Sequence, residues 1–297
     1  MRLETKAPAK LNLCLYVGGR RDDGLHELCS LFQAVTLADT VTMEPASGDA
    51  DEIVCPGVEG PNLAATALAR FRERFGWNGS PVRVTIDKRI PVAGGLGGGS
   101  ADAGAVLRLA VKASATPVHV EPLQELGMTI GADVPSQVEP GSHLVLGAGE
   151  VLERLQKTWH LSAVLLTNDA GVSTADVYAR HDEIGHARRR LDHACKDLKE
   201  AVTTAGYDLL EIRPMLHNDL EQAALDLAPH ARPALDLLAE AGARVVSLSG
   251  SGPTAFGLFD GPEEAEAAQA ALSPRWQGGE VHAVHQARSD YAVVRSS

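Results

Sequence analysis

Apolar residues recur along the chain at spacings that predict both strands and helices. Alternation over residues 11–17 predicts a half-buried strand, with Leu11, Leu13, Leu15 and Val17 on one face and Asn12, Cys14 and Tyr16 on the other. Further strands are predicted at 31–37, 40–44, 82–86, 142–146, 163–166, 244–248, 254–259 and 280–286, with a tight turn at Ala38-Asp39 between the first two. Helices are predicted at 61–75, 101–113, 121–126, 218–227, 232–241 and 263–272, and within a charged stretch at 176–211. Because these elements follow no regular strand–helix–strand rhythm, the pattern indicates an α+β fold with antiparallel sheet.

A glycine-rich stretch interrupts this pattern between the strand at 82–86 and the helix at 101–113. Five of the six residues 94–99 are glycine, so no side chain blocks the approach of a ligand to the backbone. Ser100 is a predicted N-cap of the helix, and Asp102 falls in its predicted first turn. A loop that enters a helix N-terminus offers unpaired N–H groups and the positive end of the helix dipole. The stretch therefore predicts an anion site, with a polyphosphate as the expected ligand.

The glycine stretch matches neither of two common nucleotide motifs. The ATPase loop ends in Gly-Lys-Ser/Thr, but Gly99 is followed directly by Ser100. The dinucleotide fingerprint needs a third glycine where Ser100 stands, and an acidic residue about 20 positions later, which is absent. A flexible surface linker is the remaining alternative. Periodic apolar segments flank the stretch directly on both sides, and they favour a site over a linker.

Composition and charge narrow the class of protein. The 297 residues suffice for two domains or one large one, and the net charge of -12 argues against a nucleic-acid or membrane-surface binder. No apolar run is long enough to span a bilayer, and residues 11–17 make a poor signal peptide. Cys14, Cys29, Cys55 and Cys195 form no Cys-x-x-Cys pair, which predicts free thiols and a cytoplasmic location.

Several polar residues outside the glycine stretch are candidates for chemistry, each with a structural alternative. Lys10 and Asn12 lie at the start of a predicted half-buried strand, where they could also be solvated polar residues at a strand end. Asp133 lies in the small-residue turn 131–135, where it could simply bond its own backbone. The Arg188-Arg189-Arg190 run predicts a solvated helix face, and no metal site is expected because His181, His186 and His193 lack the spacing of metal ligands.

Together, four motifs resemble the GHMP kinases over residues 6–259, nearly the whole chain. They are Pro8-Ala9-Lys10-Leu11-Asn12-Leu13, residues 91–102, Gly131-Ala132-Asp133-Val134-Pro135 and Ser249-Gly250-Ser251-Gly252. Asp23-Gly24-Leu25-His26-Glu27-Leu28 further resembles the members whose substrate is a methylerythritol that carries a cytidine diphosphate group. The resemblance implies an ATP-dependent kinase of isoprenoid precursor synthesis that phosphorylates the 2-hydroxyl of such a substrate. It also implies a mixed or antiparallel N-terminal nucleotide-binding domain at residues 1–152 and a ferredoxin-like C-terminal domain at 153–297.

The resemblance also assigns roles to individual residues. Asp133 would accept the hydroxyl proton, and Lys10 would stabilise the negative charges on Asp133 and on the transferring group. ATP, with Mg²⁺ carried by the nucleotide, would be held by Pro91, Gly94, Gly95, Leu96, Gly97, Gly98, Gly99, Ser100 and Ala101. The substrate would contact Asn12, Leu25, His26, Val172, Ser173, Thr174 and Tyr178, with His26 hydrogen-bonding an edge of the cytosine. The loop Ser249, Gly250, Ser251 and Gly252 would close the phosphate site. Neither nucleic acid nor membrane is an expected partner, and a monomer or weak homodimer is expected.

Three positions depart from the family pattern. Leu25 stands where the family usually has a tyrosine that stacks on the cytosine, and Ala101 where it usually has a second serine. Gly104 replaces an alanine, which predicts a small loss of helix stability. A kinase of the same fold for another alcohol, or a non-catalytic nucleotide-binding protein, remains an alternative. His26 argues against the first alternative, and the presence of both Lys10 and Asp133 argues against the second.

Overall fold

The computed structural model describes residues 1–296 except 59, 157–158, 186–190 and 207. The predicted solvated face at 188–190 and His186 therefore lie outside the described residues. Within the described part, none of the helices combines the length and apolar character that a bilayer crossing requires.

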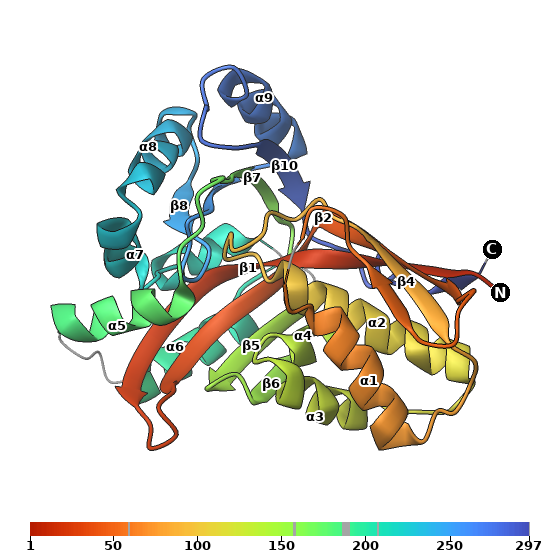
Figure 1. Cartoon of the computed structure of the whole chain (residues 1–297). Coiled ribbons are helices and arrows are strands. Elements are labelled where there is room, and N and C mark those ends of the chain that lie inside the picture. Colours follow the sequence, from red (N-terminus) through yellow and green to blue (C-terminus); the bar gives the residue numbers. More distant parts are fainter. Residues whose placement is uncertain (59, 157–158, 186–190, 207, 297) are drawn as a thin grey trace.

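The first half of the chain, together with the C-terminal strand β11, builds a mixed sheet that in the described residues has seven strands in the order β11-β1-β2-β4-β3, with β5 and β6 attached through β2. Its pairs are antiparallel except β3 with β4. The strands are β1 (Leu3–Arg20), β2 (His26–Pro45), β3 (Glu52–Val54), β4 (Val82–Asp87), β5 (Ser142–Gly147), β6 (Val151–Arg154) and β11 (Arg295–Ser296). Figure 1 shows four helices gathered against one side of this sheet: α1 (Leu63–Phe75), α2 (Gly98–Ser114), α3 (Val120–Ile130) and α4 (Val134–Val138).

The second half builds an antiparallel sheet in the order β10-β7-β9-β8. Its strands are β7 (Ser162–Leu166), β8 (Val245–Leu248), β9 (Ala255–Phe259) and β10 (Val281–His285), and α8 (Arg232–Glu240) and α9 (Pro262–Leu272) pack on it. The long connection from β7 to β8 holds α5 (Thr174–Ile184), α6 (Leu191–Thr204), η1 (Leu209–Met215), α7 (Glu221–Leu227) and η2 (Pro229–Ala231). This order is ferredoxin-like, and the predicted two-part α+β architecture is confirmed. The chain passes from one sheet to the other between β6 and β7; the domain limits 152 and 153 stay predictions.

Strand β1 is buried on both faces, so the prediction of a half-buried strand is wrong. Asn12, Cys14 and Tyr16 are as buried as the leucines between them. Both α2 and α6 pack against β1, and side chains of both alternating sets belong to the hydrophobic core. Lys10 and Asn12 are also buried, which rules out solvated residues at a strand end.

Strand β2 is continuous through the turn predicted at Ala38-Asp39. Asp39 is fully buried, and its Oδ1 accepts hydrogen bonds from the backbone N–H groups of Arg89, at 2.5 Å, and Ile90, at 2.8 Å. An aspartate suggests a turn because its carboxylate can bond nearby backbone, but here it bonds the segment that leads into the glycine stretch. The short strands β3, β6 and β11 are also absent from the sequence predictions.

Helix α1 follows the sequence prediction closely. The Asn62 side chain caps its start by accepting a hydrogen bond from the N–H of Ala64 at 2.9 Å. Gly76 ends it in the left-handed conformation, with φ 64°. The helix places Asn62 and Leu63 at the edge of the cavity described next.

Candidate active site

The glycine stretch joins β4 to α2 through a loop of left-handed backbone. Ala93, Gly95 and Gly97 have φ of 57°, 77° and 68°, and α2 begins directly after Gly97, which holds the N-cap position. Ser100 is therefore inside the first turn and is not the N-cap, and Asp102 lies beyond that turn, so both predictions are wrong. The helix starts earlier because glycine at position 97 supplies the left-handed turn that admits Gly98 and Gly99 into the helix. Gly97, Gly98, Gly99 and Ser100 at the start of α2 line the cavity described below, and the free N–H groups of a helix start are what an anion site requires.

Lys10, Asn12 and Asp133 meet beside this loop. Lys10 Nζ lies 3.5 Å from Asp133 Oδ2 and donates a short hydrogen bond to Asn12 Oδ1. Asp133 precedes α4 but makes no capping bond with its side chain, so the turn-residue alternative does not describe it. The Asp133 side chain keeps 32% of its surface exposed, whereas Lys10 is buried. A carboxylate that is reachable from the cavity and lies next to a buried cation suits an acceptor for a proton.

The loop at residues 249–252 packs directly against the glycine stretch. A Cβ added at Gly95 would lie 2.3 Å from the carbonyl oxygen of Ser249, so only glycine fits there. The Ser249 hydroxyl donates to the Gly95 carbonyl at 3.0 Å and accepts from the Asn12 N–H at 3.2 Å. Asn218 holds the loop from the other side by donating to the carbonyls of Leu248 and Gly250. The two glycine loops therefore form one rigid wall around Lys10.

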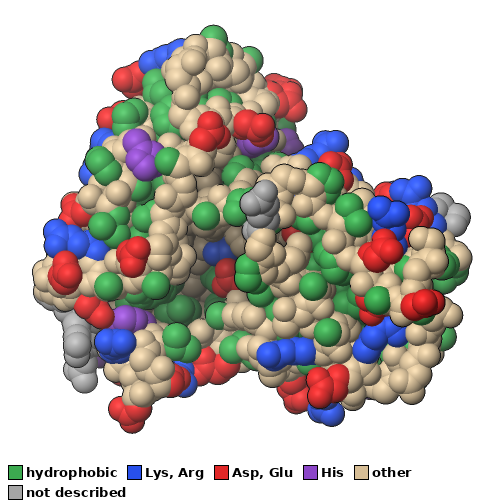
Figure 2. Space-filling model, in the orientation of Figure 1, with side chains coloured by type: hydrophobic (Ala, Val, Ile, Leu, Met, Phe, Trp, Pro, Cys, Tyr) green, Lys and Arg blue, Asp and Glu red, His purple; other side chains and the backbone are tan. Residues whose placement is uncertain are grey.

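These residues open onto two adjoining cavities of about 420 and 780 Å³. Figure 2 shows a hollow near the centre of the molecule's face, over β1, with basic and acidic side chains at its floor. Both cavities share Leu28, Phe32, Ser100, Asp133, Thr174 and Tyr178. Asp133 thus stands where a ligand in one cavity meets a ligand in the other.

The smaller cavity contains most of the residues expected at the nucleotide. Pro91, Gly94, Gly95, Gly97, Gly98, Gly99 and Ser100 line it, as do Gly250 and Ser251. Leu96 and Ala101 are buried in the hydrophobic core and do not line it, and Ser249 and Gly252 act behind it. The Ala101 side chain points into the core, so a hydroxyl at this position would not face the cavity in this chain.

Sequence reasoning missed the far end of the smaller cavity, formed by Cys55, Val58, Pro61, Asn62 and Leu63 together with Lys88 and Asp102. Lys88 bridges Asp39 and Asp102, at 2.8 Å from the latter's Oδ2, while Asp102 Oδ1 is buried without a hydrogen-bond partner. Burial, followed by the charge of Asp39, raises the pKa of Asp102 to about 7 against the opposing effect of Lys88. The sequence predicts a helix at 61–75 but carries no signal that its start faces the glycine loop.

The larger cavity brings together Leu25, His26 and Tyr178 with Thr174. The rings of His26 and Tyr178 stack, with centroids 5.1 Å apart and planes at 28°. Leu25 is 54% exposed at the rim. Burial and the nearby charge of Asp133 raise the pKa of the Tyr178 hydroxyl. Asn12 lines the smaller cavity, while Val172 and Ser173 line neither: Ser173 caps α5 by accepting from the N–H of Asp176.

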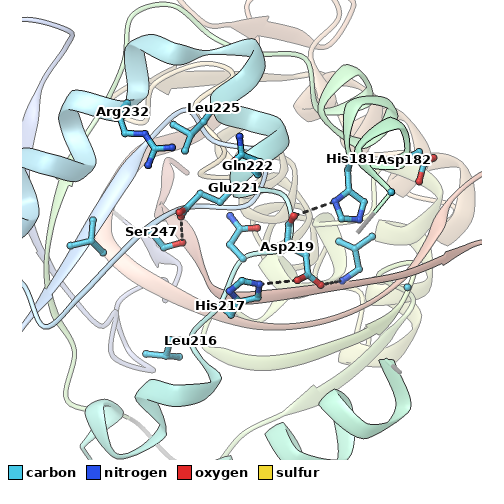
Figure 3. Close-up of a pocket in the computed structure, with 15 residues that line it drawn as sticks. His181, Asp182, Leu216, His217, Asp219, Glu221, Gln222, Leu225, Arg232 and Ser247 are labelled. Atoms are coloured by element: carbon cyan, nitrogen blue, oxygen red, sulfur yellow. Dashed lines mark hydrogen bonds and ion pairs between the residues drawn. The ribbon is translucent and has the colours of Figure 1, made fainter. Parts of the chain in front are cut away.

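A third cavity, of about 600 Å³, lies beyond α5 (Figure 3). Asp219 accepts hydrogen bonds from His217 Nε2, at 2.9 Å, and from the Val17 N–H, at 2.8 Å. Glu221 accepts from the Ser247 hydroxyl and the Leu248 N–H. The acidic groups of this cavity thus join the 216–221 segment to β1 and β8.

Among the described residues, no group of three or more His, Cys, Asp or Glu could hold a metal ion.

Gly104, predicted to cause a small loss of helix stability, has a packing role. A Cβ at this position would lie 2.4 Å from the Gln137 carbonyl oxygen. Glycine therefore lets α2 approach the backbone of α4, the helix that follows Asp133.

All four cysteines are free: Cys14 and Cys29 are buried, and Cys55 and Cys195 are partly buried.

Comparisons with known proteins agree with this geometry. Residues 62–141 match the GHMP kinases N terminal domain, and residues 198–277 match the GHMP kinases C terminal domain. Two 4-diphosphocytidyl-2-C-methyl-D-erythritol kinases are similar: that of Acaryochloris marina is 38% identical, over 88% of both chains, and that of Novosphingobium aromaticivorans is 37% identical, over 93% of this chain and 91% of its own.

Solved structures give the same result. A crystal structure of a 4-(cytidine 5'-diphospho)-2C-methyl-D-erythritol kinase covers 96% of this chain and 100% of its own, with a TM-score of 0.74 and 32% identity. A homoserine kinase from Cytophaga hutchinsonii shares the fold alone, with a TM-score of 0.73 at 20% identity over 99% of this chain and 97% of its own. On its sequence, its two matched domains and its fold, this chain belongs to the GHMP kinases.

Proposed function

We propose that this kinase transfers the γ-phosphoryl group of ATP to the 2-hydroxyl of 4-diphosphocytidyl-2-C-methyl-D-erythritol. The observation that carries the proposal is the position of the Lys10–Asp133 pair, 3.5 Å apart, between a glycine-loop cavity and a cavity that contains His26. The similar proteins named for this reaction support the choice of substrate.

In this proposal the smaller cavity binds ATP. The phosphates would lie on the N–H groups at the start of α2, and the base would lie against the apolar end formed by Val58, Pro61 and Leu63. Mg²⁺ would arrive with the nucleotide, because it needs only one or two protein ligands beside phosphate oxygens, and the Ser100 hydroxyl offers a hard oxygen donor at the cavity. The bound ion would screen the charge of the phosphates.

The chain's own residues would supply positioning and proton transfer. The 2-hydroxyl oxygen forms a bond to the γ-phosphorus, the bond to the β-phosphate bridging oxygen breaks, and ADP leaves. Asp133 takes the hydroxyl proton, since an alcohol is too weak an acid to lose it unaided. Lys10 faces both Asp133 and the loop, where a buried cation stabilises the charge of the transferring group.

A coupled assay of ADP release tests the proposal. We expect turnover with 4-diphosphocytidyl-2-C-methyl-D-erythritol and little with 2-C-methyl-D-erythritol 4-phosphate, which lacks the cytidine group. Equal turnover of both compounds, or turnover of neither, would exclude the proposed substrate.

A further inference from the structure

His26 is held by an acidic residue from a distant helix. His26 Nε2 lies 2.9 Å from Oδ1 of Asp182 on α5, and the imidazole is buried, with 7% of its side chain exposed. Figure 3 shows Asp182 beside His181 on α5, directed away from Asp219. Asp182 lines the third cavity and also the His26 cavity, where it pairs with His26.

This pairing determines which ring nitrogen carries the proton. An ionised carboxylate only accepts hydrogen bonds, so the proton of the neutral ring is on Nε2, where it meets Asp182. The remaining nitrogen, Nδ1, then presents a lone pair. Across the residues that the structure describes, no hydrogen bond occupies Nδ1. The stacking of the ring on Tyr178 restricts its rotation further.

The two pyrimidines of nucleotides differ at the atom that such an acceptor would meet. Cytosine carries an amino group at C4, which donates hydrogen bonds, whereas uracil carries a carbonyl oxygen there, which accepts them. A lone pair on Nδ1 would bind the amino group of cytosine and would face the carbonyl of uracil without a shared proton. A buried site that places two hydrogen-bond acceptors against each other discriminates between two ligands more strongly than a site that only loses an apolar contact with one of them.

We propose that Asp182 is a positioning residue that fixes the Nε2–H tautomer of His26 and thereby selects a cytosine base over uracil. The inference rests on the proposed function, since it assumes that the base of the substrate lies in the His26 cavity. Asp182 itself touches neither the base nor the reacting atoms in this account; it acts through His26.

The test compares cytidine and uridine forms of the substrate in the wild type and in Asp182→Ala, Asp182→Asn and Asp182→Glu. The wild type should prefer the cytidine form in kcat/KM. Asp182→Ala and Asp182→Asn, which free the ring to take either tautomer, should reduce that preference roughly ten- to a hundredfold, through KM for the base-bearing substrate. Their KM for ATP should not change. Asp182→Glu retains a carboxylate and should restore part of the preference.

Asp176→Asn is the matched control, because it removes the same charge from the first turn of the same helix without touching His26. Its preference for the cytidine form should equal that of the wild type. A fall in preference as large as that of Asp182→Asn would mean that only the charge of α5 matters, which would overturn the inference. An unchanged preference in folded Asp182→Ala would overturn it as well.

A binding measurement separates this inference from the proposed function. Calorimetry with CDP and UDP needs no turnover, and a non-hydrolysable ATP analogue would keep the smaller cavity filled. Selective CDP binding that is lost in Asp182→Ala supports the inference even if the wild type phosphorylates no cytidine substrate. Conversely, an active wild type whose Asp182→Ala variant still rejects UDP leaves the function standing and removes the role of Asp182.

Discussion

Gly97→Ala is the sharpest test of how the glycine loop serves the reaction. Gly97 has φ 68° and ψ 25°, and an added Cβ would lie 3.0 Å from Cγ and 3.2 Å from Cε of Lys10. Ordinary carbon–carbon contact is about 3.5–4.0 Å, so the lysine must move by roughly 0.5–1 Å. That movement would change the 3.5 Å approach of Lys10 Nζ to Asp133. A displacement of about 1 Å in a reacting group can cost about a hundredfold in rate, so we expect kcat to fall roughly ten- to a hundredfold.

Gly76→Ala separates this displacement from backbone strain. Gly76 has nearly the same backbone, with φ 64° and ψ 30°, but an added Cβ would meet no atom within 4 Å. Both variants should lose about 1–2 kcal/mol in the free energy of unfolding, measured by urea denaturation, because alanine is strained in the left-handed region. Only Gly97→Ala should lose kcat in the coupled assay. Similar kcat values for the two variants would refute the reasoning that Gly97 makes room for Lys10.

Three further outcomes follow from the site. Asp133→Asn should lower kcat by about 10²–10⁴-fold with little change in nucleotide affinity, and single-turnover kinetics with a nucleotide titration would show whether the base lies elsewhere. Leu25→Tyr adds an aromatic face at the rim of the His26 cavity and should lower KM for the cytidine substrate by up to roughly a hundredfold, with KM for ATP as the internal control. The raised pKa of Asp102, about 7 against about 3.9 unfolded, favours the folded state at low pH. That contribution is lost as pH rises from the unfolded pKa to the folded one, so the wild type should lose stability relative to Asp102→Asn between about pH 4 and about pH 7 in urea melts.

Local signals in the sequence predicted local structure well. Helix α1 spans Leu63–Phe75 where a helix at 61–75 is predicted, because its cap Asn62 and its end residue Gly76 both act within one turn of the helix. The glycine stretch is likewise a strand–loop–helix junction, as its flanking periodicity predicts. Ser100 is the exception, since an N-cap assignment from residue type cannot weigh the freedom of three consecutive glycines before it.

Contacts between residues that lie far apart in the sequence could not be predicted from local sequence patterns. Asp39 reads as a turn residue, but its hydrogen-bond donors lie some 50 residues away, at Arg89 and Ile90. Asp182 looks like any acidic residue of a charged helix, and its partner His26 is 156 residues distant. Lys10 and Asn12 could be solvated strand-end residues as far as the local pattern shows, because that pattern does not reveal that β1 is buried on both faces. The family resemblance supplied the roles of Lys10 and Asp133; their spacing in one sequence could not.

The Ser249 hydroxyl forms hydrogen bonds to Gly95 and Asn12 that affect when the active site can form during protein synthesis. Its two hydrogen bonds join segments 154 and 237 residues apart. A growing chain that has reached residue 240 already holds Lys10, the glycine stretch and Asp133, yet nothing restrains Gly95 or the Asn12 backbone from the far side. Contacts of such long sequence separation form late and slow the search for the native state. The catalytic geometry is therefore among the last parts of this molecule to be completed, and a chain truncated before β8 would carry every predicted catalytic residue without the wall that aligns them.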